Sequence, residues 1–263
     1  NYTRATFGGS GKGAFMRDFP HQTYPEALID ELQPVIDDAI RLEAPHRAAL
    51  RTLLAKAPRG EMRLDHLANM ATKDTFNVLA SAKLLARRTF DLAFVYVAEV
   101  DGASHKTWDI SPDLTAGPIG EAYERADRAL AELLQAMGAD ARCANVVVVS
   151  DHGFEWNDRG IFQHTATSPD GVLLMAGPSI RPLSVPQAPG VLDIAPTLLA
   201  LLALPPAKDM DGRVLTEILE AAPPDPIATY ETGPPRAPGT DLPVASPVEE
   251  EAQEQLRGLG YIQ

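Results

Sequence analysis

The sequence is poor in cysteine, in positive charge and in long apolar runs. The only cysteine among its 263 residues is Cys143, so no disulfide can form within the chain. Lysine and arginine number 23 against 36 aspartates and glutamates, which gives a formal net charge of −13. A surface this acidic repels polyanions and argues against binding of a nucleic acid polymer, although a metal centre could still attract a single phosphate. No apolar run is long enough to span a membrane.

The most informative stretch is a run of valines, Val146–Val149, followed directly by Ser-Asp-His-Gly. An unbroken β-branched run is typical of a strand buried on both faces, as in the parallel sheets of α/β proteins. Asp151 and His152 would then lie at the carboxyl end of a central strand, which is where open α/β sheets bind ligands. Carboxylate and imidazole are also ligand types that zinc-like cations prefer.

A second strand is predicted at Phe90–Val97, and a carboxylate and an imidazole, Asp101 and His105, follow it closely. A helix over about 119–137 would join this strand to the valine run, which predicts a right-handed parallel crossover. A third short strand is predicted at 172–176. The polar loop before it holds a further histidine, His164, so that all five candidate ligands would gather at one rim of the sheet.

The rest of the chain is predicted to be mostly helical or irregular. Scattered histidines among the early helices, His21, His46 and His66, are interpreted as surface or capping residues. The pattern is helical from Pro25 to Ala86, and its first run, from Leu28 to Ile40, is expected to break or kink at Pro34. Further predicted helices cover 46–56, about 64–88, 193–204 with Asp193 as its cap, 211–220 and 248–258. Three segments follow from this pattern: a loop and helical segment at 1–89 that could belong to a cap, an α/β segment at 90–221, and a proline-rich tail with a short terminal helix at 222–263.

Three motifs together resemble the alkaline phosphatase superfamily, and within it the type I phosphodiesterase/nucleotide pyrophosphatase group. They are Asp-x-x-x-His after a strand, Val-Val-Val-Ser-Asp-His-Gly, and a loop histidine ahead of Asp-Gly-Val-Leu-Leu-Met-Ala-Gly-Pro; the likeness covers about residues 90–220. The resemblance implies an alkaline phosphatase-like α/β fold, with a largely parallel sheet, helices on both faces and an incomplete N-terminal side. It also implies a metal-dependent hydrolase acting on small phosphate esters.

The same resemblance implies a ligand set for two divalent cations, usually zinc with manganese as the alternative. Asp101, His105 and His164 would hold one cation, and Asp151 and His152 the other. The family supplies a further Asp and a Thr or Ser nucleophile from an N-terminal half, and residues 1–89 offer neither in a suitable setting. We therefore expect the N-terminal half of the same enzyme to be the partner that completes the site.

Other interpretations stay open at this point. A cofactor-independent phosphomutase on the same scaffold would share the two ligand pairs, with manganese as its metal, and would interconvert phosphoglycerates. A sulfatase is less favoured, because no formylglycine-type motif is visible. From a different class, the chain could be a metal-binding module without catalysis. The organic group of the substrate is not identified by the sequence.

Overall fold

The structure is a computed structural model that describes residues 28–111, 113, 115–156, 162–163, 168–182 and 189–231. The chain divides into two compact units. The first contains residues 1–137, 156–163 and 245–263, and the second contains residues 138–155 and 164–244. None of the helices in the described part combines the length and the apolar character that a membrane crossing requires.

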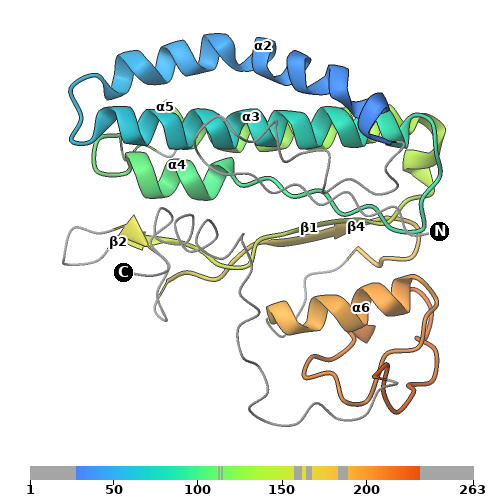
Figure 1. The fold of residues 1–263 in the computed structure, drawn as a ribbon. Helices are drawn as coiled ribbons and strands as arrows, with labels where there is room; N and C mark the ends of the chain where they lie inside the picture. Colours follow the sequence, from blue (N-terminus) through green and yellow to red (C-terminus); the bar gives the residue numbers. More distant parts are fainter. Residues whose placement is uncertain are drawn as a thin grey trace. The chain divides into compact units, whose positions relative to one another are not determined.

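The described part of the first unit is built mainly from helices: α2 (Leu28–Leu54), α3 (Gly60–Leu85), α4 (Glu99–Thr107) and α5 (Gly117–Met137) (Figure 1). The helix α3 is central, because α2, α4 and α5 all contact it. This unit also contains the very short strand β3 (Phe162–Gln163) and the second residue of β2 (Glu155–Trp156), and these two strands pair with each other. The helices predicted at 64–88 and 119–137 are therefore confirmed, with starts a few residues earlier.

Two apolar clusters hold these helices together. One joins α2 to α3 and consists of Leu32, Val35, Ile36, Ala39, Phe76, Ala80 and Leu84. The other joins the end of α2 and the start of α3 to α4 and α5, and consists of Leu50, Leu54, Leu64, Leu67, Ala103, Ile119 and Ala122. Helical spacing places these side chains on one face of each helix, so their burial stabilises the bundle.

The helix α2 runs through Pro34 and Pro45, so Pro34 does not break it, and the prediction of a separate helix at 46–56 is wrong. The alternative of a kink at Pro34 stays a prediction. Each proline removes one backbone N–H from the helix. The buried apolar stripe nevertheless continues past both prolines, from Leu32 to Leu54. Packing of this stripe against the neighbouring helices offsets the lost hydrogen bonds.

The segment Phe90–Val97 is not a strand, and the prediction of a buried strand there is wrong. Leu92, Phe94 and Tyr96 are 52%, 76% and 64% exposed. The local sequence is strand-like, but a strand forms only where a neighbouring strand accepts its hydrogen bonds. Among the described residues no strand pairs with this segment.

In the second unit, β1 (Val146–Val149) pairs with β4 (Leu173–Ala176), with Val146 opposite Ala176 and Val149 opposite Leu173. The strands at the valine run and at 172–176 are thus confirmed. Their pairing is antiparallel, so the described residues do not show the predicted parallel sheet. The described residues between β1 and β4 contain no helix that could carry a parallel crossover, and antiparallel strands need none. Val148 and Val149 are also partly exposed, at 36% and 37%.

One face of this strand pair is covered by the C-terminal part of the second unit. Leu173 and Met175 pack on Leu215, Ile218 and Leu219. The covering residues belong to the helix α6 (Ile194–Leu201) and to the 3-10 turn η4 (Thr216–Ile218) with its flanking residues. Two further 3-10 turns are η3 (Val191–Asp193), before α6, and η2 (Gly138–Arg142), before β1.

The helix predicted at 193–204 is confirmed in shorter form, while the one predicted at 211–220 is wrong. Only the single turn η4 forms there. Side chains accept hydrogen bonds from two backbone N–H groups before it, Asp193 from Arg213 N and Thr197 from Leu215 N. Asp193 therefore binds loop backbone and does not cap α6. The helix predicted at 248–258 lies outside the described residues.

Candidate metal-binding residues

The first predicted pair, Asp101 and His105, lies on the helix α4 and not in a loop after a strand. The two residues are four positions apart, which places their side chains on the same face of the helix. His105 Nε2 lies 3.5 Å from Asp101 Oδ1, and the side chains are only 7% and 20% exposed. Two ligands bound to one tetrahedral zinc at about 2.1 Å stand about 3.4 Å apart. The pair therefore has the spacing of two ligands of one cation.

The start of α4 is held by a carboxylate from another helix. The residue before α4, Ala98, has no side-chain cap. Asp74 on α3 takes that role, because its Oδ2 accepts hydrogen bonds from Ala98 N at 2.8 Å and from Glu99 N at 2.7 Å. Asp74 itself is only 5% exposed. Burial raises its pKa to about 7, although the two backbone hydrogen bonds favour the ionised form.

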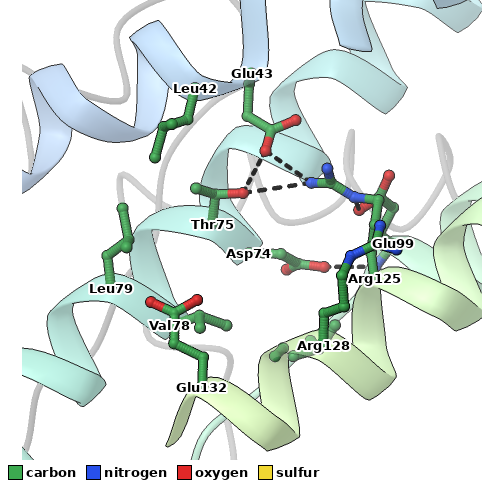
Figure 2. Close-up of a pocket in the computed structure, with 12 residues that line it drawn as sticks. Leu42, Glu43, Asp74, Thr75, Val78, Leu79, Glu99, Arg125, Arg128 and Glu132 are labelled. Carbon is green, nitrogen blue, oxygen red and sulfur yellow. Dashed lines mark hydrogen bonds and ion pairs between the residues drawn. The ribbon is translucent and has the colours of Figure 1, made fainter. Parts of the chain in front are cut away.

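A buried ionic network surrounds the same helix start (Figure 2). The Arg125 guanidinium on α5 donates from Nε to Glu99 at 2.7 Å and from Nη2 to Glu43 on α2 at 2.8 Å. The Thr75 hydroxyl on α3 donates to the same Glu43 oxygen. Residues of all four long helices thus meet around the first turn of α4.

His46 extends this network, with Nε2 3.1 Å from Glu99 and Nδ1 3.1 Å from Glu121. The hydrogen bond to Glu99 raises the pKa of His46. His66 is also largely buried, and burial lowers its pKa to about 4. The prediction that these two histidines are surface residues is therefore wrong. The third, His21, lies outside the described residues.

A pocket of about 270 Å³ lies beside the network. Its walls combine the apolar side chains of Leu42, Val78 and Leu79 with charged groups, which include Asp74 and Arg125 (Figure 2). The carboxylates of Glu43, Asp74 and Glu99 and the guanidinium of Arg125 are already bonded to groups of the protein. We therefore regard the pocket as part of the support for α4.

The second predicted pair, Asp151 and His152, follows β1 directly, as expected. His152 Nε2 lies 3.7 Å from Asp151 Oδ1, and Asp151 is 77% exposed while His152 is 21% exposed. His152 Nδ1 lies 3.1 Å from the carbonyl oxygen of Gly153. A carbonyl can only accept, so this contact places the proton on Nδ1 and the lone pair on Nε2, the nitrogen nearest Asp151. That tautomer is the one a metal bound at Nε2 requires.

Comparison with known proteins identifies the chain. The model of the type I phosphodiesterase / nucleotide pyrophosphatase family matches residues 17–208. The chain belongs to this family. No curated protein and no solved structure matches it. The resemblance found from three motifs is therefore confirmed, and the match also includes the helices before residue 90, where the sequence likeness is loose.

The type I phosphodiesterase/nucleotide pyrophosphatase family is a family of hydrolases in the alkaline phosphatase superfamily. The chain is therefore an enzyme sequence of phosphodiesterase type, and its mixed α/β content agrees with that family. Members are generally metal-dependent, often on zinc. The donor types and spacings of the two described pairs suit such a cation.

The five predicted ligands are not all placed by the structure. His164 lies outside the described residues, and within the described ranges no group of three or more His, Cys, Asp or Glu side chains gathers around a metal-sized space. Each pair is seen by itself, so the complete ligand set of this phosphodiesterase-family chain stays a prediction.

Sequence reasoning missed the residues that support α4, above all Asp74 and Arg125. One signal was available, because Asp74 lies on the apolar stripe of α3 that includes Leu67, Ala71 and Val78. A carboxylate at a position that faces the core needs a partner there. The identity of that partner, the backbone of Ala98 and Glu99, could not be read from the stripe.

Proposed function

We propose that this chain carries most of the metal ligands of a phosphodiesterase or nucleotide pyrophosphatase. In this proposal Asp101, His105 and His164 hold one divalent cation. Asp151 and His152 hold a second. The spacing within the helix pair carries the proposal, because a carboxylate oxygen and an imidazole nitrogen 3.5 Å apart suit one cation. Family membership supports both the metal dependence and the hydrolase activity.

Zinc is the favoured metal, because the donors are imidazole nitrogens and carboxylate oxygens, and manganese is the alternative. When bound, two such cations neutralise charge on the phosphoryl oxygens and lower the pKa of a hydroxyl that they bind. Asp101 and Asp151 balance the positive charge of the cations. The histidines bind only in their neutral form, so protons compete with the metal for them.

The nucleophile, a Thr or Ser hydroxyl, is expected from an N-terminal half of the same enzyme. The ligand count supports this proposal, because Asp151 and His152 alone do not complete a metal site. The substrate is a small phosphate ester that the nucleophile attacks at phosphorus. A phospho-enzyme then forms, and water hydrolyses it.

The test replaces one ligand of each pair, His105→Ala and Asp151→Asn, with the exposed Asp38→Asn as control. Metal content is measured on the chain itself, and hydrolysis of bis(p-nitrophenyl) phosphate on the enzyme completed by its N-terminal half. We expect each ligand variant to lose metal and to be slower by about a thousandfold, equivalent to roughly 4 kcal/mol of lost transition-state stabilisation. The control should match the unmodified enzyme.

Three results would contradict the proposal in different ways. Unchanged metal content and activity in both ligand variants would show that these residues do not bind the metal. Interconversion of 2- and 3-phosphoglycerate without diester hydrolysis would favour the phosphomutase. Metal binding without any turnover in the completed enzyme would favour a non-catalytic module.

A further inference from the structure

The first turn of α4 depends on a residue that is distant in the sequence. The first helical hydrogen bond of α4 runs from Gly102 N to Ala98 O at 3.1 Å. The N–H of that same Ala98 donates to Asp74, as does the N–H of Glu99. Asp74 thus binds two backbone groups at the start of the helix, where an α-helix has no acceptors of its own.

These contacts are buried and leave little room for adjustment. Asp74 is 5% exposed and Glu99, the first residue of α4, is 4% exposed. The side chain of Glu99 is held in turn by Arg125 and His46. Backbone and side chain at the start of α4 are therefore both fixed from neighbouring helices.

We propose that Asp74 is a positioning residue for the metal pair: by fixing where α4 begins, it sets the places of Asp101 and His105. The inference rests on the proposed metal-binding role of that pair. Asp101 lies in the first turn and His105 in the second, so both move when the start of the helix shifts or frays. Metal ligands must be held to within about 0.5 Å of their working geometry.

The second unit offers a matched control for a purely structural role. Asp193 also accepts hydrogen bonds from two backbone N–H groups, Gly190 N at 2.9 Å and Arg213 N at 2.8 Å. It serves a loop that carries none of the proposed ligands. Replacing Asp193 removes the same kind of contact as replacing Asp74, without touching α4.

The experiment titrates the full chain with Co²⁺ and follows the visible absorption of the bound ion. The variants are Asp74→Ala, Asp74→Asn, Asp193→Ala and His105→Ala. We expect Asp74→Ala to weaken Co²⁺ binding by about 10–100-fold and to alter the absorption bands, as is usual for groups that orient metal ligands. Both N–H groups bond to one oxygen, Oδ2, which an amide oxygen can replace. Asp74→Asn should therefore bind within about threefold of the unmodified chain.

Asp193→Ala should leave both affinity and spectrum unchanged. If Asp74→Ala does not fold, Asp74→Ser takes its place. Serine keeps a polar atom in the buried position but is too short to reach both N–H groups. We expect it to weaken Co²⁺ binding as much as Asp74→Ala. Unchanged affinity in a folded Asp74→Ala or Asp74→Ser, with His105→Ala still losing the metal, would overturn this inference and leave the proposed function intact. If His105→Ala binds Co²⁺ as well as the unmodified chain, the proposed function fails and the inference fails with it.

Discussion

The two predicted ligand pairs have the same chemistry but very different surroundings. Asp101 and His105 lie on a helix with side chains 20% and 7% exposed, and a network from three other helices holds the start of that helix. Asp151 and His152 lie in a loop after β1, and Asp151 is 77% exposed. The spacing between the donor atoms is nevertheless similar, 3.5 Å against 3.7 Å.

The difference shows two ways to place the proposed metal ligands. In the helix pair, geometry is set by packing and by buried charges, so ordering these side chains would cost little if a cation binds them as proposed. In the loop pair, adjacent residues are close simply because they are neighbours in the chain. The imidazole of His152 contacts the carbonyl oxygen of Gly153 at 3.1 Å and meets the edge of the Phe154 ring, with the ring centroids 5.3 Å apart.

The largest effect is expected when the buried support of the helix pair is removed. Arg125→Ala leaves Glu43 and Glu99, with side chains 7% and 5% exposed, without their guanidinium partner. We expect the free energy of unfolding to fall by about 3–5 kcal/mol, because each carboxylate would remain buried with less compensation.

Urea unfolding measures this change, with Arg41→Ala as the control. Arg41 pairs with Asp38 on the surface, where the side chains are 70% and 55% exposed, and its loss should cost less than about 1 kcal/mol. Equal stability of the two variants would show that the network does not support α4.

Two glycines, one near each predicted ligand pair, allow a second comparison of the two sites, with smaller expected changes in stability. A Cβ on Gly153, beside His152, would collide with the backbone of Pro169 and Asp170, which cannot move easily. A Cβ on Gly102, inside α4, would meet only the flexible thioether end of Met70. We expect Gly153→Ala to cost about 1–3 kcal/mol through overpacking. Gly102→Ala should change stability by less than about 1 kcal/mol, because alanine favours the helix.

Thermal unfolding of the two glycine variants measures which substitution costs more stability. A larger loss of stability for Gly102→Ala than for Gly153→Ala would mean that the helix tolerates an added side chain less well than the loop.

The last prediction is a pH dependence of the free energy of unfolding that arises at the helix support. The pKa of Asp74 is raised from its ordinary value of 3.8 to about 7. Between these values the folded chain keeps a proton that the unfolded chain has released. The contribution of Asp74 to stability is therefore full below pH 4 and is lost as the pH rises towards 7.

Asp74→Asn cannot titrate, so its stability should fall less than that of the unmodified chain between pH 4 and 7. Unfolding curves at several pH values measure the difference. His66, whose pKa is lowered to about 4, contributes the opposite slope in the same range, but it is present in both proteins and cancels in the comparison. If the free energy of unfolding changed equally with pH in the two proteins, Asp74 would not titrate between pH 4 and 7.

The features that follow from local pattern were predictable from the sequence. The helical spacing that predicts α3 and α5, the valine run of β1 and the apolar run of β4 each specify an element by themselves. The closeness of the two side chains within each Asp/His pair was also predictable, because the members of a pair are close in sequence. Their role as metal ligands stays a prediction.

The features that depend on distant partners were not predictable. The segment 90–97 has strand-like residues, but the described residues contain no neighbouring strand for it. The antiparallel pairing of β1 with β4 depends on the path of the chain between them. The contact of Asp74 with the start of α4 joins residues 24 and 25 positions apart, and a helical pattern does not report which backbone a buried carboxylate meets.

The exposed row of Leu92, Phe94 and Tyr96 has a consequence for the behaviour of the chain in solution. Together with the residues between them these side chains form an uncharged run with high β propensity, and they are 52–76% exposed. Such runs recruit identical segments from other molecules, edge to edge, as the protein is concentrated. A lysine in place of Phe94 should therefore raise the concentration at which the chain begins to aggregate.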